Sequence, residues 1–125
     1  MSSETLKATA DKLLEHVRSN TTKAGLDELY ATDAVSVEAM AMPGSDSAET
    51  RGVAGIRGKH DWWENTMEVH SASADGPFLH GDDRFAVIFA VEGVGKTDGK
   101  PFAMREVAVY SVSNGLIVRE KFFYA

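Results

Sequence analysis

The second half of the chain alternates between apolar and polar residues in four long runs, and this pattern restricts the fold more than any other feature of the sequence. Such alternation is typical of β-strands, in which successive side chains point to opposite faces. Short segments that contain glycine, such as Asn114-Gly115, separate the runs and can form tight turns. The pattern therefore predicts a four-stranded antiparallel meander, with strands at 69–79, 84–95, 102–113 and 116–124.

The first half of the chain carries mainly helical patterns. Residues 3–19 place apolar side chains three or four positions apart, which predicts an amphipathic helix, and a short second helix at 26–30 completes a helical hairpin. A strand, a small polar surface loop and a third helix are predicted next, at 34–42, 43–50 and 53–67. Because a domain usually spans roughly 100–200 residues, we expect a single domain of residues 1–125.

The composition limits both the chemistry and the partners. The chain has no cysteine, which excludes a thiolate nucleophile or a thiolate metal site. Its net charge of −6 and scattered basic residues argue against nucleic acid and against anionic membrane surfaces. No apolar stretch approaches the roughly 20 residues of a membrane-spanning helix, and the first residues do not resemble a signal peptide. We therefore expect a soluble, cytoplasmic protein.

The predicted strand at 84–95 is apolar on both of its faces. Phe85, Val87 and Phe89 alternate with Ala86 and Ile88, whereas a solvent-facing antiparallel strand usually has one polar face. The three helices can cover only one side of the sheet. This indicates a homodimer that forms through the outer face of the sheet, since dimers are the commonest oligomers; the alternative is an unusually apolar exposed face.

Three segments, taken with the order of the elements, resemble one known superfamily. They are Leu26–Val35, Arg51–Ile56 and the closing hairpin Val109–Glu120. Together they resemble nuclear transport factor 2-like proteins, most of all the SnoaL-like branch that includes polyketide cyclases, and ketosteroid isomerase at a distance. The resemblance implies a cystatin-like α+β fold: a cone-shaped roll of a strongly curved, mostly antiparallel sheet around a long helix, with an N-terminal helical hairpin and a pocket at its mouth.

The resemblance leaves two functions open. Such proteins include isomerases, cyclases, epoxide hydrolases, dehydratases and proteins without catalysis, so the fold does not determine the activity. One hypothesis is an enzyme without a cofactor that transfers a proton on a hydrophobic small molecule, in the manner of an isomerase, cyclase or hydratase. The other is a non-catalytic ligand-binding or structural dimer.

Two glutamates are the main catalytic candidates. Glu38 resembles in position the catalytic carboxylate of ketosteroid isomerase, and the alternative is an ordinary exposed glutamate. The resemblance also implies an aspartate on the strand before the final hairpin, as in isomerases and cyclases of this type. Here that position is Ala108, which counts against a direct transfer of either activity. Glu106 lies two residues earlier and shares the strand face of Ala108, where desolvation would raise its pKa. The alternative for Glu106 is a salt bridge at the rim.

His70 is a third catalytic candidate. It shares a strand face with Ala72 and Ala74, and a histidine beside a glutamate can serve as general acid and base near neutral pH. The alternative is a hydrogen-bonded histidine at the sheet edge. No fixed spacing of metal ligands is present, so no metal site is predicted.

The rest of the pocket wall depends on the last turn. A two-residue loop, Asn114-Gly115, would place Arg119 and Lys121 on the wall of Glu106. A three-residue loop that also includes Ser113 would place Glu120 and the terminal aromatic residues there, and the resemblance favours this arrangement. The predicted pocket lining consists of Met40, Trp63, Glu92, Ala108, Tyr110, Glu120, Phe122 and Tyr124.

Overall fold

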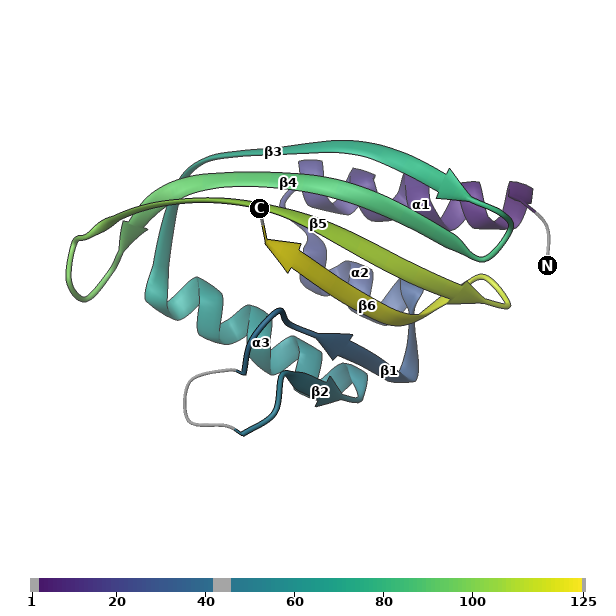
Figure 1. Cartoon of the computed structure of the whole chain (residues 1–125), viewed down its shortest axis with the longest axis horizontal. Coiled ribbons are helices and arrows are strands. Elements are labelled where there is room, and N and C mark those ends of the chain that lie inside the picture. The colour runs from purple at the N-terminus through teal and green to yellow at the C-terminus, as the bar shows by residue number, and fades with distance from the viewer. Residues whose placement is uncertain (1–2, 42–45, 125) are drawn as a thin grey trace.

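The computed structural model describes residues 3–41 and 46–124 (Figure 1). Within these residues, three helices and six strands follow one another. In order they are α1 (Ser3–Arg18), α2 (Thr22–Leu29), β1 (Tyr30–Val37), β2 (Glu49–Arg51), α3 (Val53–Thr66), β3 (Met67–His80), β4 (Arg84–Gly95), β5 (Pro101–Ser113) and β6 (Leu116–Tyr124).

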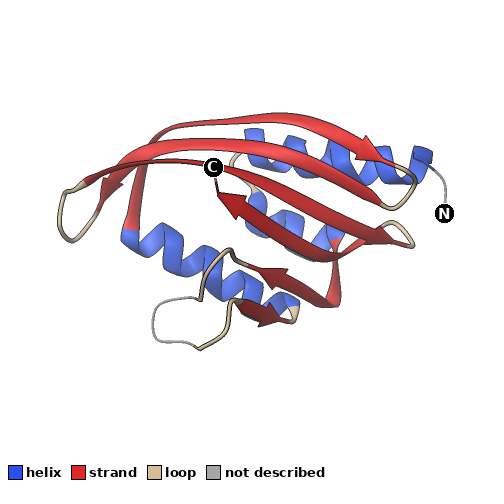
Figure 2. Cartoon of the chain, viewed as in Figure 1, coloured by secondary structure: helices blue, strands red, loops and turns tan. Residues whose placement is uncertain are grey.

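The six strands form one curved sheet in the order β2-β1-β6-β5-β4-β3. Among the described residues, β1 pairs with β6 in parallel, and the other four pairings are antiparallel. The long strands β3, β4 and β5 bend together over the helices, while α3 lies next to β1 and β2 (Figure 2). The predicted fold class, an α+β roll with a mostly antiparallel sheet, is confirmed.

The core lies between the helical hairpin and the inner face of the sheet. The apolar stripe of α1 is buried, with Leu6 at 0% and Leu14 at 2% exposure, and it packs in one cluster with Phe85 and Val87 of β4. Burial of a leucine side chain contributes roughly 1.5–3 kcal/mol to folding. Because Phe85 and Val87 face the helices, strand alternation places Ala86 and Ile88 on the opposite face of the sheet, which we call the outer face.

The segment between α1 and α2 differs from its predicted form. The second helix was predicted at 26–30, yet α2 already begins at Thr22 and includes a buried Gly25. A Cβ at Gly25 would lie 3.1 Å from the His16 ring, so glycine allows the two helices to approach closely. The His16 ring also contacts Glu28 Oε1 at 2.7 Å, which ties α1 to α2.

The region of β1 and β2 also departs from expectation. The predicted strand at 34–42 instead begins at Tyr30 and ends at Val37, and the predicted loop at 43–50 ends in β2. Three residues are too few to show alternation in the sequence, and β2 forms through backbone pairing with β1, where Thr50 lies opposite Ser36. Residues 42–45 lie outside the described part.

The final hairpin combines features of both predicted loops. Its turn is the two-residue Asn114-Gly115, with φ of 52° and 79°, values typical of a type I′ turn. A β-bulge follows, because Val112 pairs with Ile117 whereas Ser111 pairs with Arg119, so Val118 is an extra residue. The predicted three-residue loop was therefore wrong, but the bulge produces the same wall: Tyr110 lies opposite Glu120, and Glu106 lies opposite Tyr124.

No helix in the described ranges 3–41 and 46–124 combines the length and the apolar character needed to cross a bilayer.

Candidate functional site

A buried carboxylate stands at the inner end of the site. Glu120 of β6 is only 3% exposed, and its two oxygens accept hydrogen bonds from Tyr30 and from Ser36 Oγ, the latter at 2.7 Å. The parallel pairing of β1 with β6 sets Ser36 directly beside Glu120. Burial raises the pKa of Glu120, while these hydroxyls and the charge of Lys59 act in the opposite direction.

Lys59 connects this carboxylate to a second one. From α3 its Nζ donates to Ser36 Oγ at 2.7 Å and to Glu38 Oε2 at 2.8 Å. The side chains of Lys59 and Glu38 are only 17% and 15% exposed, so the ion pair is largely shielded from water. Nζ also lies 5.5 Å from the centre of the Phe122 ring, within the range of a cation–π contact.

Tyr124 completes the set of contacts at the C-terminal end of β6. Its hydroxyl donates to Glu38 Oε1 at 2.7 Å, so both oxygens of Glu38 are engaged. Burial, together with the hydrogen bond to Glu38, raises the pKa of Tyr124, because its ionised form would meet a carboxylate.

These contacts form one continuous chain, which we call the interior network. Each carboxylate in it accepts, and each hydroxyl or ammonium donates, so every link has a consistent direction. The network consists of Tyr30, Ser36, Glu38, Lys59, Glu120 and Tyr124.

Glu106 lies beside the interior network without joining it. It is half-buried on β5, and no hydrogen-bond or ion-pair partner for its carboxylate is found in residues 3–41 and 46–124. Burial raises its pKa to about 7, with further contributions from the negative charges of Glu38 and Glu120 and an opposing one from Lys59. A carboxyl group with this pKa can both take up and release a proton near neutral pH.

Aromatic and apolar residues surround the carboxylates. Tyr110 is 3% exposed and stacks on Phe85 with ring centres 4.8 Å apart, and Ala108 is fully buried. Phe122 packs against the core from β6. Trp63 of α3 is half-buried and meets Phe102 edge to face at 5.5 Å. The structure thus brings most of the predicted lining residues to the inner side of the sheet.

Three predicted site residues lie elsewhere. His70 is exposed on the edge strand β3, where Nε2 contacts Glu68 Oε2 at 2.9 Å, because the bulge between Val69 and Ser71 interrupts the alternation on which its inward direction depended. Met40 is 70% exposed beyond the end of β1. Glu92 points outward from β4.

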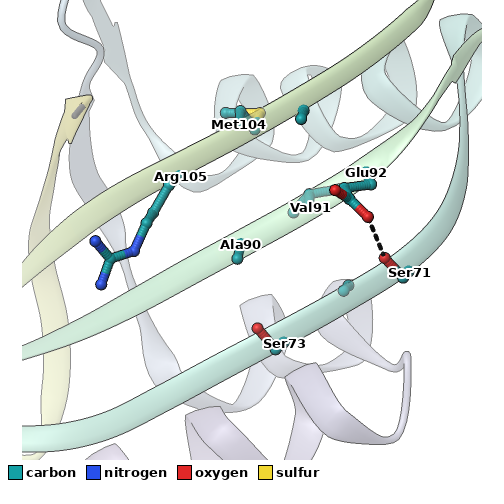
Figure 3. Close-up of a pocket in the computed structure, with 9 residues that line it drawn as sticks. Ser71, Ser73, Ala90, Val91, Glu92, Met104 and Arg105 are labelled. Carbon is teal, nitrogen blue, oxygen red and sulfur yellow. Dashed lines mark hydrogen bonds between the residues drawn. The ribbon is translucent and has the colours of Figure 1, made fainter.

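Glu92 belongs to a hollow on the outer face of the sheet (Figure 3). The hollow has a volume of about 480 Å³, and small residues of β3 and β4 such as Ser73 and Ala90 form its floor. Glu92 accepts a hydrogen bond from Ser71 Oγ there at 3.3 Å. This surface is opposite to the one that carries Glu106, so Glu92 does not line the interior site.

Sequence reasoning missed Tyr30, Ser36 and Lys59 as site residues. Lys59 lies three positions after Ile56 and four before Trp63, on the apolar stripe of the helix, where a lysine is unexpected unless it has an anionic partner. Ser36 shares the strand face of Glu38. Tyr30 was predicted only as the last residue of the second helix, at 26–30, whereas it begins β1.

This arrangement of three helices, a curved six-stranded sheet and inward-facing carboxylates defines a nuclear transport factor 2-like α+β roll. The SnoaL-like domain family matches the chain over residues 4–124. The chain belongs to this family, and the resemblance noted in the sequence is confirmed. No functionally curated protein matches the chain.

Solved structures agree with this assignment. A Mesorhizobium loti protein provisionally named a SnoaL-like polyketide cyclase is 33% identical, with a TM-score of 0.86 over 95% of this chain and 98% of its own. A provisionally named isomerase from Bacillus subtilis is 21% identical, with a TM-score of 0.76 over 100% and 90% of the two chains. An NTF2-like protein of unknown function from Burkholderia pseudomallei is 16% identical, with a TM-score of 0.76 over 100% and 92%. The last two share the fold.

Proposed function

We propose that this protein is an enzyme without a cofactor that transfers a proton on a hydrophobic small molecule, with Glu106 as the general base and acid. The observation that carries the proposal is the contrast between three neighbouring carboxylates. Glu38 and Glu120 are held by donors, whereas Glu106 has no partner within the described residues and has a pKa of about 7.

The chemistry that suits this arrangement is removal of a proton from carbon next to a carbonyl group. Glu106 accepts the proton while the electron pair moves to the carbonyl oxygen, and the same carboxyl group returns the proton to the original or to a neighbouring carbon. A pKa near the working pH serves both halves of such a shuttle. Glu38 is less suited to be the base, because both of its oxygens already accept hydrogen bonds.

Two further features support a ligand of small size and apolar character. Phe122 and the inner face of β4, including Phe89, present apolar surface beside Glu106, while Tyr124 is 41% exposed and marks the side that is open to solvent. The names of the relatives, an isomerase and a polyketide cyclase, denote reactions of the same general kind, which adds support by family membership.

The test is exchange of carbon-bound hydrogen in D₂O. A panel of cyclic and aromatic ketones is incubated with the protein, and loss of the ¹H signal next to the carbonyl is followed by NMR. We expect exchange that E106Q reduces by about a hundredfold or more, in line with the usual contribution of a general base. The matched control is E92Q, which changes a glutamate on the outer face and should exchange at the unaltered rate.

The competing hypothesis is a ligand-binding domain without catalysis. It predicts no exchange above background for any ketone, or exchange that E106Q leaves unchanged, and either result would refute the proposed function.

A further inference from the structure

We infer that Lys59 binds an oxygen atom of the ligand and stabilises the negative charge that forms on it when Glu106 removes a proton. The inference extends the function proposed for Glu106 to a second residue, one that the sequence did not single out.

The first argument is the number of hydrogen atoms on the ammonium group. A charged lysine has three N–H donors and no acceptor. Two of them point to Ser36 Oγ and Glu38 Oε2, at 2.7 and 2.8 Å, and no third acceptor for Nζ is found in residues 3–41 and 46–124. The third donor faces no polar acceptor there and has the Phe122 ring nearby, 5.5 Å from Nζ, so it is available to a ligand that lies against this ring.

The second argument is the direction of the hydrogen bonds. The single hydrogen of the Ser36 hydroxyl goes to Glu120 Oε2 at 2.7 Å, so Ser36 must accept from Lys59 rather than donate to it. An ammonium that donates to two neighbours has no lone pair, and covalent attack on a carbonyl carbon is therefore not its role. The same group is suited to hold a carbonyl or enolate oxygen.

The third argument is the field of Lys59 at the other acids of the site. Nζ lies 5.5 Å from the Phe122 ring, and Phe122 pairs with Ala108, two residues from Glu106 on the same strand face. The charge of Lys59 accordingly favours the ionised forms of both Glu106 and Glu120. With 17% of the side chain exposed, water screens this charge only partly. A fixed donor aimed at developing negative charge in such a site lowers the barrier to reaction.

The resulting step is balanced without any further reactant. The C–H bond next to the carbonyl breaks, its proton passes to a Glu106 oxygen, and its electron pair forms the C=C bond of an enolate. The enolate oxygen takes the negative charge beside Lys59, and the proton returns from Glu106 to a carbon. No oxidation or reduction takes place.

The experiment uses 4-nitrophenol as a stable stand-in for the enolate, since its phenolate absorbs at longer wavelength than the phenol. The pH is set where the free probe is mainly phenol. On the wild-type protein we expect a saturable phenolate band, because the phenol O–H proton can pass to Glu106 or solvent while Lys59 holds the anion.

Two variants show whether Lys59 carries this effect. K59M is expected to weaken phenolate binding about tenfold or more, the usual cost of a lost hydrogen bond to a charged group. K7M removes an exposed lysine on α1, whose partner is Asp11, and is expected to bind the probe as the wild type does. Equal phenolate binding by K59M and wild type, or no bound phenolate on the wild type, would overturn the inference.

A second measurement covers the case in which K59M does not fold. In wild-type protein labelled with ¹⁵N-lysine, the Nζ signal of Lys59, assigned by its loss in K59R, should shift as 4-nitrophenol is added. An unchanged signal at saturating probe contradicts the inference.

The two proposals fail in different ways. The phenolate band requires no turnover, so it reports on binding of the anion and not on proton transfer to or from carbon. If E106Q abolishes hydrogen exchange while K59M keeps the band, only the inference about Lys59 is wrong. If E106Q leaves exchange unchanged, the proposed function is wrong whatever the probe shows.

Discussion

Tyr124 lies opposite Glu106 in the pairing of β5 with β6, yet its hydroxyl reaches across the site to donate to Glu38 Oε1 at 2.7 Å. Tyr124 is thus the strand partner of Glu106 but the hydrogen-bond donor of Glu38. Glu38 is thereby engaged, whereas no partner for the Glu106 carboxylate is found in residues 3–41 and 46–124.

The stability of the fold should respond to the pH in a way that identifies Glu106. The pKa of Glu106 is about 7 in the folded state, compared with 4.5 for an ordinary glutamate such as that of the unfolded chain. The folded state therefore holds the proton more tightly. The contribution of this group to the free energy of unfolding is therefore complete at low pH and is lost as pH rises to about 7. We expect E106Q to gain on the order of 1–3 kcal/mol relative to wild type over that range.

Urea unfolding of both proteins from pH 4.5 to 8 would measure this difference. A constant gap between E106Q and wild type across the range would show that Glu106 has no raised pKa in the folded state.

Removal of the Tyr30 hydroxyl should destabilise the protein, because it leaves an oxygen of the buried Glu120 without a donor. We expect Y30F to lose about 1–3 kcal/mol, the usual cost of a buried acceptor left unsatisfied. Y110F is a suitable control: Tyr110 is also buried, and no hydrogen bond of its hydroxyl is found in residues 3–41 and 46–124. Chemical denaturation compares the two, and equal losses would count against a special role for the Tyr30–Glu120 contact.

Two glycine-to-alanine substitutions should have opposite effects. Gly58 lies inside α3 with open space around it, so G58A should stabilise the protein by about 0.5–1 kcal/mol through helix propensity. Gly93 lies in β4, where an added Cβ would overlap the carbonyl oxygen of Glu68, so G93A should be strongly destabilising. Thermal unfolding is sufficient to measure both, and a stable G93A would contradict the close approach of Gly93 to Glu68.

The outer face of the sheet should hold a second copy of the chain. Ile88 lies opposite Val107, which lies opposite the 47% exposed Phe123, and these apolar residues form a row across three strands on the side away from the helices. We expect a dimer in sedimentation equilibrium, and I88K should shift it toward monomer. M40K changes a residue beyond β1 that is 70% exposed, and it should leave the apparent mass of the dimer in sedimentation equilibrium unchanged. A monomeric wild type would contradict the expectation.

The extent of successful sequence-based prediction follows from the physics of each element. The four meander strands were found within two residues at each end, because long alternating runs between turns leave few other structures. β2 was missed, since its three residues carry no period. The direction of His70 was missed as well, because the bulge beside it depends on contacts between strands that local sequence does not reveal.

The site shows the same division. Glu106 and Tyr110 share an inner wall, as the alternation of a long strand requires. The contacts of Glu38 with Lys59 and Tyr124 join residues 21 and 86 positions apart in the chain. Such contacts depend on how α3 and β6 come to lie beside the end of β1, and spacing along one sequence does not contain that information.

The extra residue Val118 determines which charge the interior receives. With the same two-residue turn and Val118 paired regularly with Ser111 instead of bulged, the outward Arg119 and Lys121 would take the inward places now held by Glu120 and Phe122, and two cations would replace an anion and an aromatic ring. Deletion of Val118 would remove the bulge and leave Glu120 inward, because Arg119 would then follow Ile117 in regular register, whereas one extra residue beside a retained bulge would turn Glu120 outward. Relatives that are one residue shorter here should therefore form a regular hairpin without the bulge.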